Sequence, residues 1–145
     1  MTEIEFHVNV PDKLHYSCRL LRKAHRSGIR VVVTAEPALL AQLDQLLWTF
    51  SGHDFLPHCS SNASALTLAA TPIQLAQQLQ GSPADSVLMN LGQQPPADFE
   101  RFLRFIEVAS DVSEDILAAR VRWKHYKDRG YALKKHDLLT GLDVA

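Results

Sequence analysis

Gly28-Ile29-Arg30-Val31-Val32-Val33 is the stretch of sequence that decides the fold. Three consecutive valines after an isoleucine are typical of a strand that is covered on both faces, as in parallel sheets. The glycine ends the preceding helix, because it readily adopts the left-handed backbone found at helix C-termini. That helix is indicated by apolar residues at helical spacing, namely Leu14, Cys18, Leu21 and Ala24. After the strand, a second helix is predicted from Pro37, with one apolar stripe formed by Leu39, Leu43, Leu46 and Phe50.

A further strand is predicted before the first helix. Glu3–Val10 alternates between polar and apolar residues, which is typical of a half-buried strand. Pro11 ends it, and Asp12 is a suitable N-cap for the helix that follows. The order strand, helix, strand, helix requires parallel strands joined by right-handed crossovers. We therefore predict an α/β fold with an open, mainly parallel twisted sheet and helices on both faces.

The middle of the chain has weaker local signals. Residues 51–63 are predicted to be a loop, Leu66–Ala70 a short strand, and Pro72–Gln80 a short helix or turn. The run Ser86–Leu91 indicates another buried strand. The segment Phe99–Val108 suits either a helix or a helix that runs into a strand.

The longest predicted helix lies near the C-terminus. Ser113 is its expected N-cap, acidic residues follow in its first turn, and Gly130 ends it after Arg129. We predict a single α/β domain over residues 1–131 and a partly ordered tail over residues 132–145.

Composition excludes several classes of protein. The 145 residues are 46% hydrophobic, with a formal net charge of −1, which does not fit a protein whose whole surface binds DNA or anionic lipid. No apolar run is long enough to span a membrane. The N-terminus lacks the basic and then apolar pattern of a signal sequence. Only two cysteines are present, Cys18 and Cys59, as expected for reduced thiols in a cytoplasmic protein.

Sequence signatures of catalysis are absent. The fold is expected to be Rossmann-like, but no Gly-x-Gly-x-x-Gly fingerprint or Gly-Lys-Ser/Thr phosphate-binding loop occurs. His53, Asp54 and His58 lie near Cys59, yet their spacing matches no zinc motif. We therefore predict no metal, no cofactor and no enzymatic activity, with a hydrolase that uses these histidines as a remote alternative.

Charge is distributed unevenly along the chain. Residues 113–136 carry seven basic and three acidic side chains, whereas residues 36–112 carry two basic and eight acidic ones. On the last helix Arg120, Lys124 and Lys127 share one face, and Trp123 lies about 60° away from Arg120. This arrangement suits an acidic peptide with an apolar anchor, or a few stacked bases that contact Trp123 and Tyr126. Alternatively, both rings pack on the sheet and the bases are only solvated.

Two stretches resemble the chi subunit family of bacterial DNA polymerase III. Leu47-Trp48-Thr49-Phe50, followed by Asp54-Phe55-Leu56-Pro57-His58, is similar to the Leu-Trp … Phe-x-Pro-His signature of that family. The segment Arg122-Trp123-Lys124-His125-Tyr126-Lys127-Asp128-Arg129-Gly130-Tyr131 is similar to its Arg-Tyr-Lys-x-Tyr ending, with Trp123 where relatives often carry Tyr. The resemblance covers nearly the whole chain.

The resemblance implies a non-catalytic bridge in the replicative polymerase. One surface would bind the psi subunit of the clamp loader, and another the acidic C-terminal tail of single-stranded-DNA-binding protein, so that DNA is reached only indirectly and no membrane is involved. The implied tail-binding residues are Arg120, Trp123, Lys124 and Lys127, and Ile116 stands where relatives can carry a further base. For psi we expect Trp48, Phe55, Pro57 and His58 to form an aromatic docking patch. The alternatives are that Trp48 is a core residue, and that the chain binds single-stranded nucleic acid directly through its basic last helix.

Overall fold

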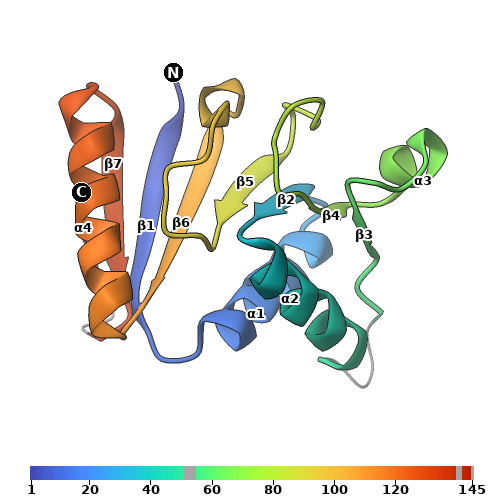
Figure 1. The fold of residues 1–145 in the computed structure, drawn as a ribbon, viewed down its shortest axis with the longest axis horizontal. Coiled ribbons are helices and arrows are strands. Elements are labelled where there is room, and N and C mark those ends of the chain that lie inside the picture. Colours follow the sequence, from blue (N-terminus) through green and yellow to red (C-terminus); the bar gives the residue numbers. More distant parts are fainter. Residues whose placement is uncertain (51–54, 140–141, 145) are drawn as a thin grey trace.

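The strand β2 (Val31–Thr34) is buried over its whole length, between β4 and β5 of a single eight-stranded sheet. The computed structural model describes residues 1–50, 55–139 and 142–144 (Figure 1). The strand order is β3-β4-β2-β5-β6-β1-β7-β8; the first seven strands run parallel and β8 is antiparallel to β7. The other strands are β1 (Glu3–Val10), β3 (His58–Ser60), β4 (Ile73–Leu75), β5 (Val87–Asn90), β6 (Arg104–Ser110), β7 (Ala132–Asp137) and β8 (Leu142–Val144). The predicted open, mainly parallel α/β sheet is confirmed.

Helices cover both faces of the sheet. The helices α1 (Lys13–Arg26) and α2 (Pro37–Thr49) pack on one face, and α4 (Ser113–Asp128) packs on the other (Figure 1). Asp12 caps α1 as predicted, since its side chain accepts a hydrogen bond from the amide of His15. Gly28 has φ +73°, the left-handed conformation expected directly after that helix. Within the described residues, no helix is both long and apolar enough to cross a membrane.

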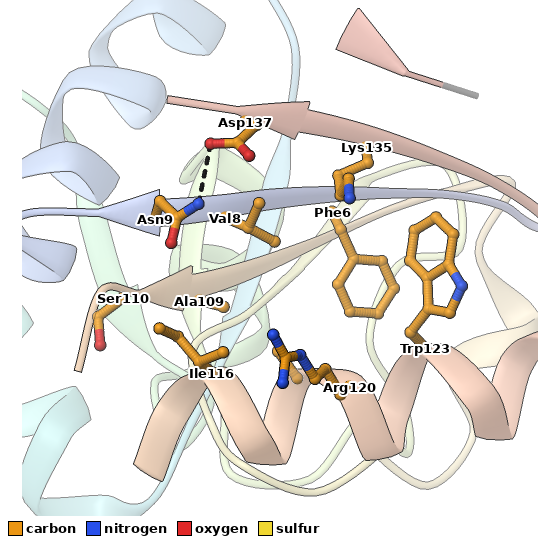
Figure 2. A pocket seen from close by; sticks show the side chains of 11 residues that line it. Phe6, Val8, Asn9, Ala109, Ser110, Ile116, Arg120, Trp123, Lys135 and Asp137 are labelled. Carbon is orange, nitrogen blue, oxygen red and sulfur yellow. Dashed lines mark hydrogen bonds between the residues drawn. The ribbon is translucent and has the colours of Figure 1, made fainter. Parts of the chain in front are cut away.

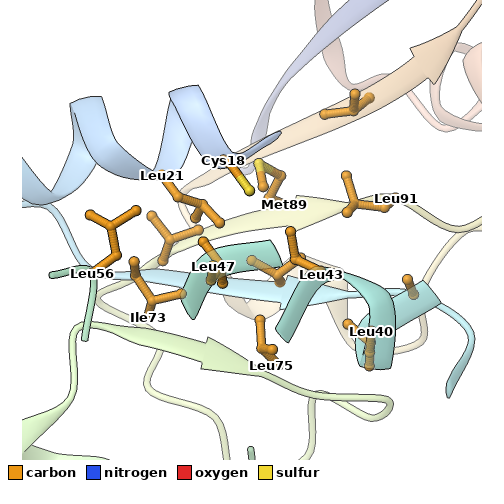
Figure 3. Packing of buried hydrophobic residues seen from close by; sticks show 14 of the residues in the cluster. Cys18, Leu21, Leu40, Leu43, Leu47, Leu56, Ile73, Leu75, Met89 and Leu91 are labelled. Atoms are coloured by element: carbon orange, nitrogen blue, oxygen red, sulfur yellow. The ribbon is translucent and has the colours of Figure 1, made fainter. Parts of the chain in front are cut away.

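Two hydrophobic layers hold the helices on the sheet. Under α1 and α2, the leucines of both helices interdigitate with valine, isoleucine and methionine side chains from β2, β4 and β5 (Figure 3). Under α4, the layer is richer in aromatic rings, with Phe6, Phe99, Phe105 and Tyr126 packed against one another. Aromatic pairs at these centroid separations, 5.1 to 5.9 Å, add to the burial of their apolar surface.

Two predictions for the middle of the chain are wrong. Leu66–Ala70, expected as a strand, belongs to the short helix α3 (Ala65–Ala70), which begins where the Ser64 hydroxyl accepts a hydrogen bond from the amide of Thr67. Pro72–Gln80, expected as a helix or turn, contains β4, whose three residues are all buried between β2 and β3. Both segments are too short for hydrophobic periodicity to distinguish a helix from a strand. Their conformation depends on whether they pair with the sheet.

Other boundaries are refined by the structure. The predicted loop 51–63 includes the edge strand β3, and Phe99–Val108 follows the second alternative, a 3-10 turn (Phe99–Arg101) that leads into β6. Val112, rather than Ser113, is the N-cap residue of α4, without a side-chain cap. The predicted strand within Ser86–Leu91 is confirmed as β5.

The segment assigned to the C-terminal tail contains a strand of the main sheet. Residues 132–137 form β7, which pairs with β1 from Glu3–Ala132 to Val8–Asp137. Its sequence, Ala-Leu-Lys-Lys-His-Asp, is too polar to indicate a strand, and none of its six residues is fully buried in the structure. The parallel sheet therefore extends beyond residue 131, and this addition completes a pocket beside α4.

Candidate functional site

A pocket of about 380 Å³ lies between α4 and the strands β1, β6 and β7 (Figure 2). Ile4, Phe6 and Val8 of β1 point toward α4, and the residues that pair with them on β7 point the same way. The residues that line the pocket are Phe6, Val8, Asn9, Ala109, Ser110, Ile116, Ala119, Arg120, Trp123, Lys135 and Asp137.

One wall of the pocket is a helical row. Ile116, Arg120 and Trp123 lie at positions i, i+4 and i+7 of α4 and therefore share one flank of the helix. The Trp123 ring packs edge-to-face against Phe6, with 5.1 Å between ring centroids (Figure 2). Ile116, Trp123 and Phe6 give the pocket an apolar floor, which lies beside the exposed side chain of Arg120.

A second cation enters the pocket from the opposite wall. Lys135 lies on β7, directly across from Phe6 of β1. Sequence reasoning missed this residue because it lay in the segment taken as a tail, where the polar run of residues 134–137 offers no periodic signal. Arg120 and Lys135 together make the pocket mouth positive on both sides of an apolar surface.

The far end of the pocket is polar and ordered. The side-chain amide of Asn9 donates a hydrogen bond to the Asp137 carboxylate, 2.9 Å away. The same carboxylate oxygen accepts a hydrogen bond from the amide of Leu139 at 2.9 Å. Asn9 has φ +57°, a left-handed conformation that asparagine tolerates better than most residues. These contacts fix the end of β1 against the end of β7.

The other two predicted tail-binding residues lie outside the pocket lining. Lys124 is exposed, and its Nζ lies 2.9 Å from the Asp128 carboxylate one turn later. Lys127 is also exposed on the outer surface of α4. The structure thus brings Arg120 and Trp123 together and leaves the two lysines on the surface beyond them.

Two residues of the basic helix belong to the core. Arg122 and Tyr126 are both completely buried, and Arg122 Nε lies 3.1 Å from Glu107, which is also completely buried. The Tyr126 hydroxyl and the Asn90 amide donate to the same carboxylate, and Arg122 Nη1 donates to the carbonyl of Gln93. Burial raises the pKa of Glu107 to about 7, against the opposing effects of Arg122 and the hydrogen bonds. The idea that Arg122 adds to a basic surface and that Tyr126 can stack on bases is therefore wrong.

The beginning of α4 is held by an ionic contact between three elements. The Asp115 carboxylate accepts a hydrogen bond from the Ser110 amide at 2.6 Å, and Lys13 Nζ of α1 lies 3.1 Å away. Burial alone would raise the pKa of Asp115, but these donors outweigh it and hold the pKa below its usual value. This contact fixes the register of α4 over β6, and with it the position of Arg120.

A second candidate surface lies at the end of α2. The Trp48 ring packs against Phe55 and His58, with centroid separations of 5.6 and 4.7 Å. Trp48 is 56% exposed and Phe55 62%, so the alternative that Trp48 is a core residue is wrong. Pro57 is half-buried beside them. The Leu-Trp and Phe-x-Pro-His stretches therefore meet in one exposed aromatic cluster.

His58 has a structural environment inside this cluster. Its Nδ1 donates to the carbonyl of Leu56 at 2.7 Å, and its Nε2 lies 3.2 Å from the Asp44 carboxylate. His53 and Asp54, the other members of the imagined hydrolytic group, lie outside the described residues. Over residues 1–50, 55–139 and 142–144, no three His, Cys, Asp or Glu side chains are grouped so as to hold a metal ion.

Comparison with known proteins agrees with the two motifs. The family model for "DNA polymerase III chi subunit, HolC" matches residues 1–134. The chain belongs to the DNA polymerase III chi subunit family. It is also 31% identical over 144 residues to DNA polymerase III subunit chi of Pseudomonas aeruginosa, an alignment that covers 95% of this chain and 98% of the relative. The resemblance inferred from the sequence motifs is confirmed, and the family supports a role as an accessory subunit in replication.

Proposed function

We propose that this chain is a non-catalytic, cytoplasmic replication adaptor, which joins the clamp loader of DNA polymerase III, through its psi subunit, to the acidic C-terminal tail of single-stranded-DNA-binding protein. The observation that carries the proposal is the pocket beside α4, which combines an apolar floor with cations on two walls. An acidic segment that ends in an apolar residue and a free carboxylate needs these features.

The pocket suggests a role for each residue. The terminal Phe side chain of the tail packs on Phe6 and Trp123, and its carboxylate receives the forked donors of Arg120. Lys135 faces the same carboxylate from β7. Lys124 and Lys127 attract the aspartates that precede the terminal Phe of the tail. Both lysines are exposed, and exposed charges contribute mainly to the rate of association. Ile116 extends the apolar floor in place of a further cation.

Calorimetric titration with a synthetic tail peptide that ends in Asp-Ile-Pro-Phe tests the proposal. We expect one-to-one binding that weakens as salt is raised, because several contacts are ion pairs at an exposed rim. A matched peptide without the terminal Phe should bind at least about tenfold more weakly, since it lacks the apolar anchor. Equal binding of the two peptides, or no binding at either salt concentration, would contradict the assignment.

The aromatic cluster at the end of α2 is proposed as the psi-binding surface. Trp48 and Phe55 expose large rings that lie against each other, and buried Trp and other aromatic side chains dominate binding energy at protein interfaces. The aromatic cluster is formed by α2 and the loop before β3, whereas the tail pocket is formed by α4 and β7. Because the two surfaces share no element, both partners can bind at the same time.

Replacement of Trp48 by alanine should weaken binding of purified psi by about tenfold or more. Phe55→Ala should have a smaller effect in the same direction. Because Trp48 is largely exposed, the variant should stay folded, as thermal unfolding would verify. Arg120→Ala is the matched control and should bind psi like the wild type. An unchanged affinity of Trp48→Ala for psi, measured by calorimetry, would place the psi surface elsewhere.

Direct binding of single-stranded nucleic acid by α4 is the weaker candidate. Tyr126 is completely buried and Trp123 is packed against Phe6, so that the helix lacks the row of exposed rings on which successive bases stack. Separate titrations with an oligonucleotide and with the tail peptide distinguish direct nucleic-acid binding from binding of the acidic tail.

A further inference from the structure

A second positive segment of the chain lies outside both proposed binding surfaces. Between Asp12 and Glu36 there are six basic residues and no acidic one. Five of the six lie on α1, which packs on the opposite face of the sheet from α4. Neither the tail pocket nor the aromatic cluster uses them.

Four of the side chains on α1 form a single row. His15, Arg19, Arg22 and Arg26 follow the spacing i, i+4, i+7 and i+11, which places them within an arc of about 60° on the helix. The row is about 16 Å long, at a rise of about 1.5 Å per residue. His15, Arg19 and Arg26 are exposed and Arg22 is half-buried, whereas Ser17, Cys18 and Leu21 of the same helix are buried, so that the row faces solvent.

Aromatic rings support the arginines of this row. The Arg22 guanidinium lies 5.0 Å from the centroid of the Phe50 ring, and Arg19 lies 5.7 Å from that of Tyr16. His15 packs edge-to-face on the same Phe50 ring, with 5.2 Å between centroids. Cation–π contacts of this kind orient a guanidinium without using its N–H donors.

Three bases in and beside the row, Arg19, Arg22 and Lys23, are not neutralised by an ion pair within the described part of the chain. The two other bases of the segment do have structural roles. Lys13 pairs with Asp115, and Arg30 donates to the carbonyls at the end of α3.

We propose that this α1 row binds the phosphate backbone of nucleic acid directly. Guanidinium groups match phosphate geometry better than ammonium groups do, and three of the four side chains in the row are arginines. Their steps of about 4.5 to 6 Å along the helix allow them to follow successive phosphates of one strand. The proposal goes beyond the proposed function, in which DNA is reached only through the single-stranded-DNA-binding protein.

Other anionic partners fit the row less well. Insertion into a membrane surface requires an exposed apolar face on the helix, whereas the apolar side of α1 is buried in the core. An acidic peptide with an apolar anchor requires a concave apolar floor, as in the pocket beside α4, and a helix surface is convex. A phosphate backbone requires only a row of cations with accessible donors.

Fluorescence anisotropy of the full chain with labelled oligothymidylate tests the proposal at low salt. The triple variant Arg19→Gln/Arg22→Gln/Lys23→Gln should bind about tenfold or more weakly than the wild type. The slope of the logarithm of the association constant against log salt is negative, and it should become less negative by about 2 in this variant. Each phosphate contact contributes about 0.7 on a single strand, and the variant lacks three cations. A mixed-sequence duplex serves as a second probe and shows whether the row prefers one strand or a double helix.

The matched control removes the same charge from the other helix. Lys124→Gln/Lys127→Gln/Arg129→Gln should retain oligonucleotide binding within about twofold. Equal losses in both triple variants would indicate non-specific charge attraction, and a loss in the α4 variant alone would favour that helix; either result overturns the proposal. Binding of phosphatidylserine vesicles that depends on the row, without binding of either nucleic acid, would overturn it as well.

Three further measurements keep the result interpretable. Arg19→Lys/Arg22→Lys retains the charge and should bind only a few-fold more weakly, which separates charge from guanidinium geometry. The α1 triple variant should bind the tail peptide like the wild type, so that failure of this proposal is distinct from failure of the adaptor function. Urea unfolding verifies that the variants are folded.

Discussion

Replacement of Arg122 by alanine is expected to lower the free energy of unfolding by about 3–5 kcal/mol. The Arg122 and Glu107 side chains are both completely buried and lie 3.1 Å apart. Removal of the guanidinium takes away the buried counter-charge of Glu107, so that the carboxyl group is either charged without a partner or has to take up a proton, and it leaves a cavity beside that group. Urea unfolding at neutral pH measures the loss. Arg120→Ala, an exposed arginine on the same helix, is the matched control and should change stability by less than about 0.5 kcal/mol.

The loss caused by Arg122→Ala should increase with pH. Burial already raises the pKa of Glu107 to about 7, and without Arg122 this pKa rises further. A carboxyl group whose pKa is higher in the folded than in the unfolded chain stabilises the fold at low pH. This contribution is lost as pH rises through the folded-state pKa. The unfolding free energies of variant and wild type should therefore diverge above about pH 7.

Addition of Glu107→Gln to the Arg122→Ala variant identifies the source of this divergence. The glutamine does not ionise, and so the pH dependence above about pH 7 should disappear in the double variant. A loss below about 1 kcal/mol in Arg122→Ala, or the same pH dependence with and without Glu107, would mean that the buried pair does not hold α4 on the sheet.

Arg120→Ala is expected to weaken binding of the tail peptide by about 30-fold, or about 2 kcal/mol. Arg120 is the only arginine that lines the described pocket, where it stands between Ile116 and Trp123. A bidentate contact with a terminal carboxylate is lost completely when the side chain is truncated. Calorimetry against the wild type measures the change, and the same variant remains stable because the side chain is exposed.

Two lysine variants show which walls form the site. Lys135→Ala, on β7, should weaken peptide binding several-fold, because the ammonium faces the pocket. Lys127→Ala, outside the lining, should have less than about a threefold effect. A change below about twofold in Arg120→Ala would show that the tail binds elsewhere, and larger effects of Lys127 than of Lys135 would move the site to the outer surface of α4.

The first half of the fold could be predicted because its signals are local. Asp12 caps α1 with its own side chain, and Gly28 supplies the left-handed backbone after that helix. The valine run of β2 is buried on both faces, as its composition indicates. By contrast, α3 and β4 are short segments whose conformation depends on whether a neighbouring strand accepts their hydrogen bonds, and the prediction failed for both.

For the candidate site, the sequence determined the helix, the row that contains Arg120 and Trp123, and the two family motifs, since helical spacing fixes which side chains share a face. Only the tertiary structure decided which cations remain available. It buries Arg122 against Glu107, a partner 15 positions away on β6, and it brings Lys135 to the pocket through pairing of β7 with β1. Charge alone does not distinguish a surface base from a buried one, because burial depends on packing between elements that are distant in the chain.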